Sequence, residues 1–187
     1  MSCVVGVWCD ESQSGAIATD SAMECSFADG SSLVRTAKTR KLWRPNDSTI
    51  IAAVGNWLDV SVLRDVTCGK RELEALLRGT AEFVTIYRES LAVYREKNTT
   101  EGAAAIVLSA DVGMFEFGSD FTRVQYESGR YAIGSGCEFA LGALFVMNGY
   151  TGMSLAGQAS RAVKAAAEYS PTVREPVIVD GLSSPQS

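Results

Sequence analysis

The stretch that decides the fold is Cys3-Val4-Val5-Gly6-Val7-Trp8-Cys9, a short apolar run at the start of the chain. The polar segment 10–14 follows it, and then comes a second apolar run at 15–19, Gly-Ala-Ile-Ala-Thr. Short runs of this kind, separated by turn-forming residues, are typical of a β-hairpin. Strands joined by a short turn pair antiparallel. We therefore expect an antiparallel sheet around residues 3–19.

Strand and helix patterns continue in separate blocks. Residues 49–54 predict another buried strand, and helical periodicity follows over 58–66 and 73–94. Further strands are expected at 103–109, 114–118, 121–126, 130–133 and 176–179, with helices over 135–147 and from 153 to Pro171. Segregated strands and helices disfavour a doubly wound parallel sheet. The pattern predicts an α+β sandwich in which helices cover antiparallel sheets.

Composition limits the classes of function. The chain has 187 residues, 47% of them apolar, which predicts a single domain over 1–187 with a flexible tail at 183–187. No apolar run approaches the ~18 residues of a membrane span, and the start lacks the features of a secretory signal. We therefore expect a cytoplasmic protein without a membrane partner. The net charge of −5, with no basic stripe, argues against nucleic acid.

The chain contains no histidine. This excludes Ser-His and Cys-His nucleophile pairs and every His-liganded metal site. The five cysteines are odd in number and form no C-x-x-C pair, which argues against a zinc site or a disulfide framework. The sequence therefore predicts neither a metal nor another cofactor.

Ser2 is a candidate nucleophile that needs no histidine. Removal of Met1 would leave a serine that carries both a hydroxyl and a free α-amine. The reference pKa of such an amine is about 7.7–8.0, so it can act as a base near neutral pH. Met-Ser starts are common, and Ser2 alone does not distinguish a nucleophile from an arbitrary second residue.

Several segments, taken in order, resemble the proteasome β-subunit family of N-terminal nucleophile (Ntn) hydrolases, and bacterial HslV peptidases in particular. They are Ser2-Cys3-Val4-Val5-Gly6-Val7, Ala16-Ile17-Ala18-Thr19-Asp20-Ser21, Thr39-Arg40-Lys41-Leu42, Ile51-Ala52-Ala53-Val54-Gly55, Tyr131-Ala132-Ile133-Gly134-Ser135-Gly136 and Phe139-Ala140-Leu141-Gly142-Ala143. The resemblance runs from Ser2 to about residue 179. It implies a four-layer αββα sandwich, the Ntn-hydrolase fold.

The resemblance also implies a role for each matching residue. Ser2 would attack the peptide carbonyl. Lys41 would assist proton movement beside it, and Asp20 would pair with Lys41. The backbone N–H of Gly55 would stabilise the oxyanion, and Ser135 would bond near the N-terminal amine.

Each of these residues also has a purely structural interpretation. Lys41 is otherwise an exposed strand lysine in a short basic cluster, and Asp20 ends a strand. Gly55 is otherwise a backbone bend. Ser135 begins the sequence Ser-Gly-Cys-Glu, which predicts a capping box at the start of the next helix.

The chain departs from the family pattern in three places. Serine replaces the usual threonine at position 2, and Asp20 lies slightly farther along the chain than is typical. Segment 168–175 lacks the paired glycines of the family, with Glu168 and Ser170 as substitutes for the usual Asp and Ser. Only Met1 precedes Ser2, so no propeptide is expected.

The partners and the alternatives follow from the same resemblance. It implies stacked rings of identical subunits, an unfolded polypeptide as substrate and, as an optional partner, an ATP-dependent unfoldase. One alternative is a non-catalytic ring or shell component that retains Met1, because Ser2 would then have an amide nitrogen instead of a basic amine. The other is an amidase of the Ntn class that acts on a small molecule.

Overall fold

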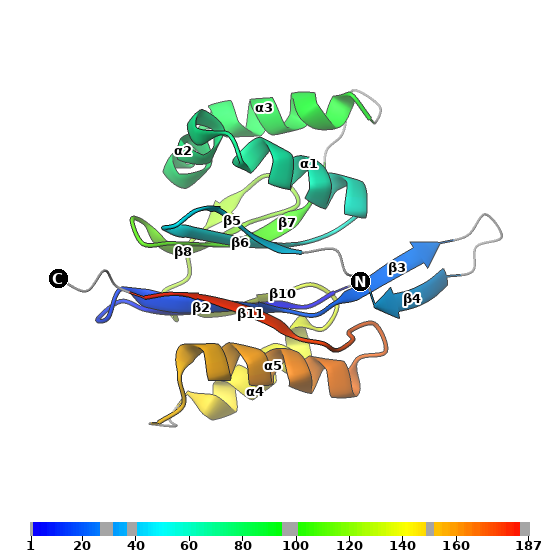
Figure 1. Ribbon diagram of the computed structural model, residues 1–187, viewed down its shortest axis with the longest axis vertical. Helices are drawn as coiled ribbons and strands as arrows, with labels where there is room; N and C mark the ends of the chain where they lie inside the picture. Colours follow the sequence, from blue (N-terminus) through cyan, green and yellow to red (C-terminus); the bar gives the residue numbers. More distant parts are fainter. Residues whose placement is uncertain (1, 27–31, 37–40, 95–100, 149–151, 184–187) are drawn as a thin grey trace.

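The computed structural model describes residues 2–26, 32–36, 41–94, 101–148 and 152–183. Met1, Thr39, Arg40 and the predicted tail beyond Ser183 lie outside these residues. The described chain forms four layers, in which two sheets lie face to face and helices cover both outer faces (Figure 1). This is the α+β, αββα arrangement expected above.

The first sheet has the strand order β10-β1-β2-β11. Its strands are β1 (Val4–Cys9), β2 (Ser14–Thr19), β10 (Arg130–Ile133) and β11 (Ile178–Leu182). The predicted hairpin of β1 and β2 lies at its centre, and all its neighbours pair antiparallel. Residues from both ends of the chain therefore meet in this sheet.

The second sheet has the order β5-β6-β7-β8-β9 and is also antiparallel. Its strands are β5 (Leu42–Asn46), β6 (Thr49–Val54), β7 (Ala104–Ser109), β8 (Gly113–Phe117) and β9 (Arg123–Val124). A separate pair, β3 (Ala22–Ser26) and β4 (Ser32–Thr36), projects beyond the sandwich (Figure 1).

Helices α1 (Trp57–Thr67), α2 (Lys70–Arg78) and α3 (Ala81–Ala92) cover the second sheet. Helices α4 (Cys137–Met147) and α5 (Leu155–Tyr169) cover the first. Three hydrophobic clusters fill the spaces between the four layers. The cluster between the sheets includes Val4, Ile17, Ile50, Ile106 and Leu108, all nearly inaccessible to solvent.

The sequence-based boundaries were wrong in several places, and the last strand, expected at 176–179, is Ile178–Leu182. The helix expected over 73–94 is two helices, because the chain turns at Gly79, whose φ of +67° is a left-handed conformation that favours glycine. Of the strand expected at 121–126, only the two residues of β9, Arg123–Val124, form a strand. Strands β3, β4 and β5 were not predicted, since their polar or mixed sequences lack clear alternation.

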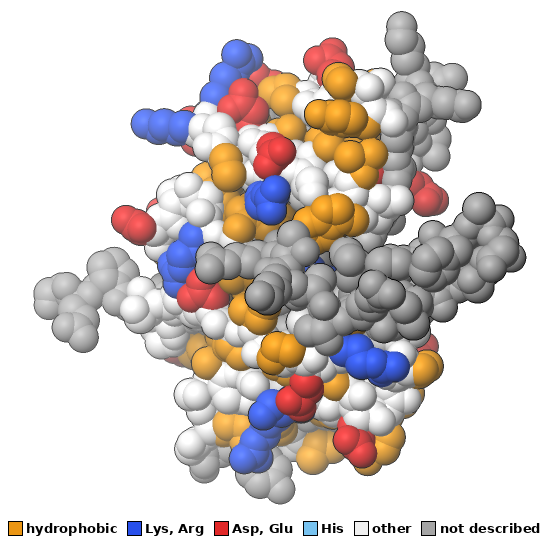
Figure 2. Space-filling view, turned by 45° about the vertical axis from the view of Figure 1, so that its right-hand side comes forward, with side chains coloured by type: hydrophobic (Ala, Val, Ile, Leu, Met, Phe, Trp, Pro, Cys, Tyr) orange, Lys and Arg blue, Asp and Glu red, His pale blue; other side chains and the backbone are white. Residues whose placement is uncertain are grey.

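On the face drawn in Figure 2, acidic and basic side chains of the described residues are interspersed. Among the described residues, no helix is long and apolar enough to cross a membrane.

Candidate active site

The pairing of strands brings four of the predicted residues to one end of the sandwich. Ser2 precedes β1 and Asp20 follows β2, and these ends meet because Val4 pairs with Thr19. Ser135 follows β10, whose Ile133 pairs with Val4 on the other side of β1. Lys41 directly precedes β5 and enters from the second sheet.

Ser2, Lys41 and Asp20 form a buried triangle of hydrogen bonds. The Ser2 Oγ donates to Asp20 Oδ1 at 2.8 Å and accepts from Lys41 Nζ at 2.6 Å. Lys41 Nζ also donates to Asp20 Oδ1 at 3.0 Å. Ser2 is only 3% exposed and Asp20 is fully buried. The Ser2 hydroxyl is thus held between a cation and a carboxylate.

The backbone fixes the position of Asp20. Its Oδ1 accepts the N–H of Cys3 at 3.0 Å, and its Oδ2 accepts the N–H groups of Ala22 at 2.9 Å and Arg174 at 3.4 Å. Charge-assisted bonds from several donors compensate the burial of a carboxylate. Asp20 is therefore a rigid support for Lys41 and Ser2, and the interpretation of Asp20 as a mere strand end is incomplete.

Burial changes the protonation of the two groups beside Ser2. It lowers the pKa of the Lys41 ammonium below its ordinary value, against the opposing effect of the Asp20 charge. Burial also raises the pKa of the Cys3 thiol to about 12, and Asp20 adds to this effect. Because the reactive form of cysteine is the thiolate, Cys3 is unreactive near neutral pH. Of the adjacent residues Ser2 and Cys3, Ser2 therefore remains the candidate nucleophile.

Ser135 contacts the backbone of Ser2. Its Oγ accepts from the Ser2 nitrogen at 3.0 Å and lies 3.3 Å from the Ser2 carbonyl oxygen. The chain passes close to Ser2 here because Gly134 has a φ of +95°, and a Cβ on it would lie 2.3 Å from that carbonyl oxygen. The predicted capping box is wrong. Helix α4 has Gly136 as its N-cap and no side-chain cap, since the Ser135 hydroxyl is used at Ser2.

Gly55 lies at the end of β6, with its backbone exposed and a φ of +137°. A Cβ at this position would lie 3.1 Å from the Ala103 Cα, so a side chain would be strained and crowded. The preceding Val54 approaches Gly134, beside the Ser2 carbonyl. The structure thus puts the residue before Gly55 close to Gly134, and the part of Gly55 in binding an oxyanion stays a prediction.

Sequence analysis missed Thr172, which completes the polar network. The Oγ1 of Thr172 lies 2.8 Å from Ser135 Oγ and 2.9 Å from Ser170 Oγ. Glu168, offered as a substitute acid, is exposed on α5, and Ser170 is linked to Ser135 through Thr172. The signal that could have found Thr172 is the pair of hydroxyl residues that flank Pro171 directly after the helix.

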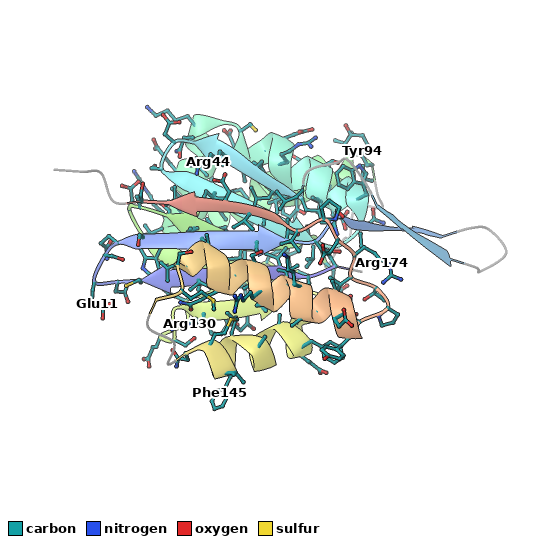
Figure 3. The ribbon with its side chains drawn as sticks, turned by 60° about the horizontal axis from the view of Figure 1, so that its bottom comes forward. Glu11, Arg44, Tyr94, Arg130, Phe145 and Arg174 are labelled. Atoms are coloured by element: carbon teal, nitrogen blue, oxygen red, sulfur yellow. The ribbon has the colours of Figure 1, made fainter. Side chains whose placement is uncertain are left out.

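Segment 170–174 is therefore part of the site. Beyond the contacts of Thr172, the Arg174 carbonyl accepts the N–H and the hydroxyl of Ser21 at 3.1 and 3.3 Å, while the labelled Arg174 side chain lies beyond the end of α5 (Figure 3). Within the described ranges, no group of three or more Cys, Asp or Glu side chains could hold a metal ion.

The four-layer fold described above is shared with known structures. No protein-family model and no curated protein matches the chain. Solved structures do match, HslV among them, so the Ntn-hydrolase fold and the resemblance found in the sequence are confirmed at the level of the fold.

Among these structures are BPH from Thiobacillus denitrificans and eukaryotic HslV from Trypanosoma brucei. BPH in complex with epoxomicin has a TM-score of 0.77 at 20% identity, over 98% of this chain and 100% of BPH. A second BPH structure gives 0.76 at 20% identity, with the same coverage. The HslV structure gives 0.69 at 20% identity, over 97% of this chain and 99% of HslV.

Proposed function

We propose that the protein is a self-compartmentalising peptidase of the proteasome and HslV type, with Ser2 as an N-terminal nucleophile exposed by removal of Met1. The observation that carries this proposal is the Ser2 hydroxyl held by Lys41 at 2.6 Å and Asp20 at 2.8 Å, next to a backbone nitrogen bound by Ser135. The likeness to HslV and to an epoxomicin-bound BPH supports it.

The chemistry begins at the Ser2 amine. The neutral amine takes the Oγ proton, and the oxygen attacks the carbonyl carbon of a peptide bond. The charge that develops on the carbonyl oxygen is stabilised by the backbone N–H of Gly55. The ammonium then gives its proton to the leaving amine, and an ester on Ser2 remains. Water hydrolyses this ester with the same amine as base and restores the hydroxyl.

Lys41 and Asp20 assist these steps, and the Ser2 hydroxyl proton turns from Asp20 Oδ1 to the amine of the same residue. The Lys41 ammonium, 2.6 Å from Ser2 Oγ, stabilises negative charge that develops on that oxygen. Asp20 holds the ammonium in place and compensates its burial. A serine in place of threonine supplies the same hydroxyl and the same amine. The proposed substrate is an unfolded polypeptide that reaches sites enclosed in stacked rings of this chain, fed by an ATP-dependent unfoldase, in the cytoplasm.

The test combines intact mass with activity on a panel of fluorogenic peptides. We expect the purified chain to lack the mass of Met1 and to cleave at least one peptide. Ser2→Ala should lower the turnover number at least about a thousandfold, whereas Ser2→Thr, which keeps the hydroxyl, should remain active. Ser12→Ala, at an exposed serine in the β1–β2 turn, is the matched control.

Two results would contradict the proposal. Retention of Met1 in every copy, with no turnover, would indicate the non-catalytic ring component. Turnover of small amides but of no peptide, by a particle too small to be a ring on native mass measurement, would indicate the small-molecule amidase.

A further inference from the structure

A cavity lies at the end of β10 that is farther from Ser2. Its volume is about 200 Å³. The residues that line it come from the segment 128–130 and from α4 with its C-cap: Ser128, Arg130, Leu141, Leu144, Phe145 and Asn148. Arg130 pairs with Val7 of β1, whereas the candidate active site adjoins the pairing of Val4 with Ile133. The cavity is therefore separate from the site around Ser2.

The Arg130 side chain is held in place by a buried glutamine. Its Nε and Nη2 both donate to Oε1 of Gln158 in α5, each at 3.3 Å. Gln158 is only 5% exposed, and its Nε2 donates to the Met153 carbonyl at 3.2 Å, which fixes the orientation of the amide. These bonds use one edge of the guanidinium. They leave the N–H groups at its Nη1–Nη2 end for another acceptor.

The charge of Arg130 has no counter-charge beside it. The Gln158 amide is neutral, and no carboxylate in the part of the chain that the structure describes lies within ion-pair distance of Arg130. Glu127, the acid nearest in sequence, is exposed, and the one charged residue of α4 is Glu138 in its first turn, at the opposite end of the helix. A half-buried cation of this kind is stabilised by an anion that enters the same space.

The other walls of the cavity are mostly apolar. Leu144 is buried, whereas Leu141 and Phe145 lie on the exposed side of α4, and Phe145 is 83% exposed. Arg130 and Phe145 lie toward the same end of the layer that α4 and α5 form (Figure 3). A ligand that covers these side chains would remove apolar surface from water. The cavity thus combines one fixed cation with an apolar wall.

We propose that this cavity binds an apolar carboxylate, whose two oxygens accept from Nη1 and Nη2 of Arg130 and whose apolar part lies against Leu141 and Phe145. The parallel N–H groups of a guanidinium match a carboxylate in spacing and direction. The volume is below the ~300–1,000 Å³ of sites for drug-sized ligands. It therefore suits a short-chain acid or the C-terminal residue of a peptide, which present the same chemistry. Ser2 has no part in this binding, so the inference is independent of the proposed function.

Isothermal titration calorimetry on the full chain would compare acids with neutral amides of the same shape. Hexanoate against hexanamide represents a free acid, and N-acetyl-leucinate against N-acetyl-leucinamide represents a peptide C-terminus. We expect at least one acid to bind with a Kd of about 1 mM or below. Its amide should bind at least about tenfold more weakly, because the charge-assisted pair is lost. The acid that binds more tightly identifies the source of the ligand.

Variants of the lining residues would locate the binding. Arg130→Met removes the charge but keeps an extended stem, and it should weaken binding of the acid at least about tenfold. Phe145→Ala should weaken it about threefold or more, because part of the apolar wall is lost. Val146→Ala is the matched control, since Val146 is also exposed on α4 but is not among the residues that line the cavity. This control should bind as the wild type does.

Three results would overturn the inference. They are the lack of saturable binding of either acid up to about 10 mM, amides that bind as tightly as the acids, and an Arg130→Met or Phe145→Ala chain that binds the acid as tightly as the wild type. If Arg130→Met does not fold, Phe145→Ala decides, because its side chain lies outside the core. Peptide cleavage is not the readout, so a failure here and a failure of the proposed function are distinguishable.

Discussion

The two helical layers pack on their sheets in opposite ways. Between α1–α3 and the second sheet the contacts are aromatic: Phe83 meets Phe117 edge-on at 5.3 Å, and Tyr87 meets Phe121 at 5.8 Å. Between α5 and the first sheet, which lie side by side in Figure 1, they are made by small side chains, among them Ala159, Ala162 and Ala166, all fully buried. The layer built from small residues is the one that carries Ser2 and Ser135.

This difference indicates that the two layers have different roles, one in stability and the other in positioning the candidate site. Large side chains fill the first space and supply most of the apolar area that stabilises the domain. Small side chains let helix and strand backbones approach closely, so few long side chains are there to adjust when a backbone moves. Changes in the aromatic layer should therefore lower stability, and changes in the small-residue layer should disturb the candidate active site.

The largest expected effect is on stability, from Phe83→Ala. Phe83 is 1% exposed and its ring packs on Phe117 and Tyr87. The cavity should lower the free energy of unfolding by about 3–5 kcal/mol. Because the ring contacts of Phe83 are with Tyr87 and Phe117 and not with the candidate site residues, kcat per folded molecule should stay within about twofold of wild type. Denaturant unfolding would measure the free energy of unfolding, and active-site titration would give kcat per folded molecule. A large fall in kcat per folded molecule would contradict the separate roles of the two layers.

The reverse pattern is expected for Gly136→Ala. A Cβ on Gly136 would lie 2.6 Å from Val173 Cγ2 and 3.0 Å from Ala166 Cβ, and the residue adjoins Ser135. Overpacking should cost about 1–3 kcal/mol of stability, and displacement of Ser135 should lower kcat more than tenfold.

Gly142→Ala is the matched control. Gly142 lies in α4 with open space around it. This change should therefore raise the free energy of unfolding by up to about 1 kcal/mol and leave kcat unchanged. Equal activity in both variants would contradict the account.

The smallest effect concerns the ion pair that joins the two sheets. Arg44 of β5 donates to both carboxylate oxygens of Asp180 in β11, at 2.7 and 2.8 Å. The Arg44 guanidinium holds the pKa of Asp180 below its ordinary value. The pair therefore stabilises the fold above about pH 4, and this contribution is lost as the pH falls through the lowered pKa.

Asp180→Asn should remove this contribution. The pair is partly exposed, so the change near neutral pH should be at most about 1 kcal/mol. The stability of the variant should fall less steeply than that of wild type as the pH is lowered below about 4, while activity per folded molecule stays the same. Parallel stability curves for the two proteins, from urea unfolding at several pH values, would show that the pair contributes nothing.

Local signals in the sequence predicted most of the fold. The first two strands, the buried strands of the second sheet and the helices over 137–147 and 155–169 follow from hydrophobic periodicity. The pair β3 and β4 did not, because neither sequence, Ala-Met-Glu-Cys-Ser or Ser-Leu-Val-Arg-Thr, alternates clearly enough to predict a strand. The break at Gly79 was hidden inside a continuous apolar stripe.

The site was predictable where a resemblance existed and not where the chain departs from it. Ser2, Asp20, Lys41 and Ser135 meet in the structure as that resemblance implied. Thr172 was missed although hydroxyl residues flank Pro171, because its partner Ser135 is 37 residues away and this local pattern does not indicate their contact. The capping box at Ser135 failed for a related reason, since a distant partner competed for the same hydroxyl.

The most direct test of the central claim is the site of covalent labelling by a peptide epoxyketone such as epoxomicin. Its ketone and its epoxide match a hydroxyl and an amine on one residue, so the account predicts a single adduct on the N-terminal peptide of a chain that lacks Met1. The same peptide should stay unlabelled in Ser2→Ala. An adduct elsewhere, no adduct at all, or Met1 still attached to Ser2 would contradict the account.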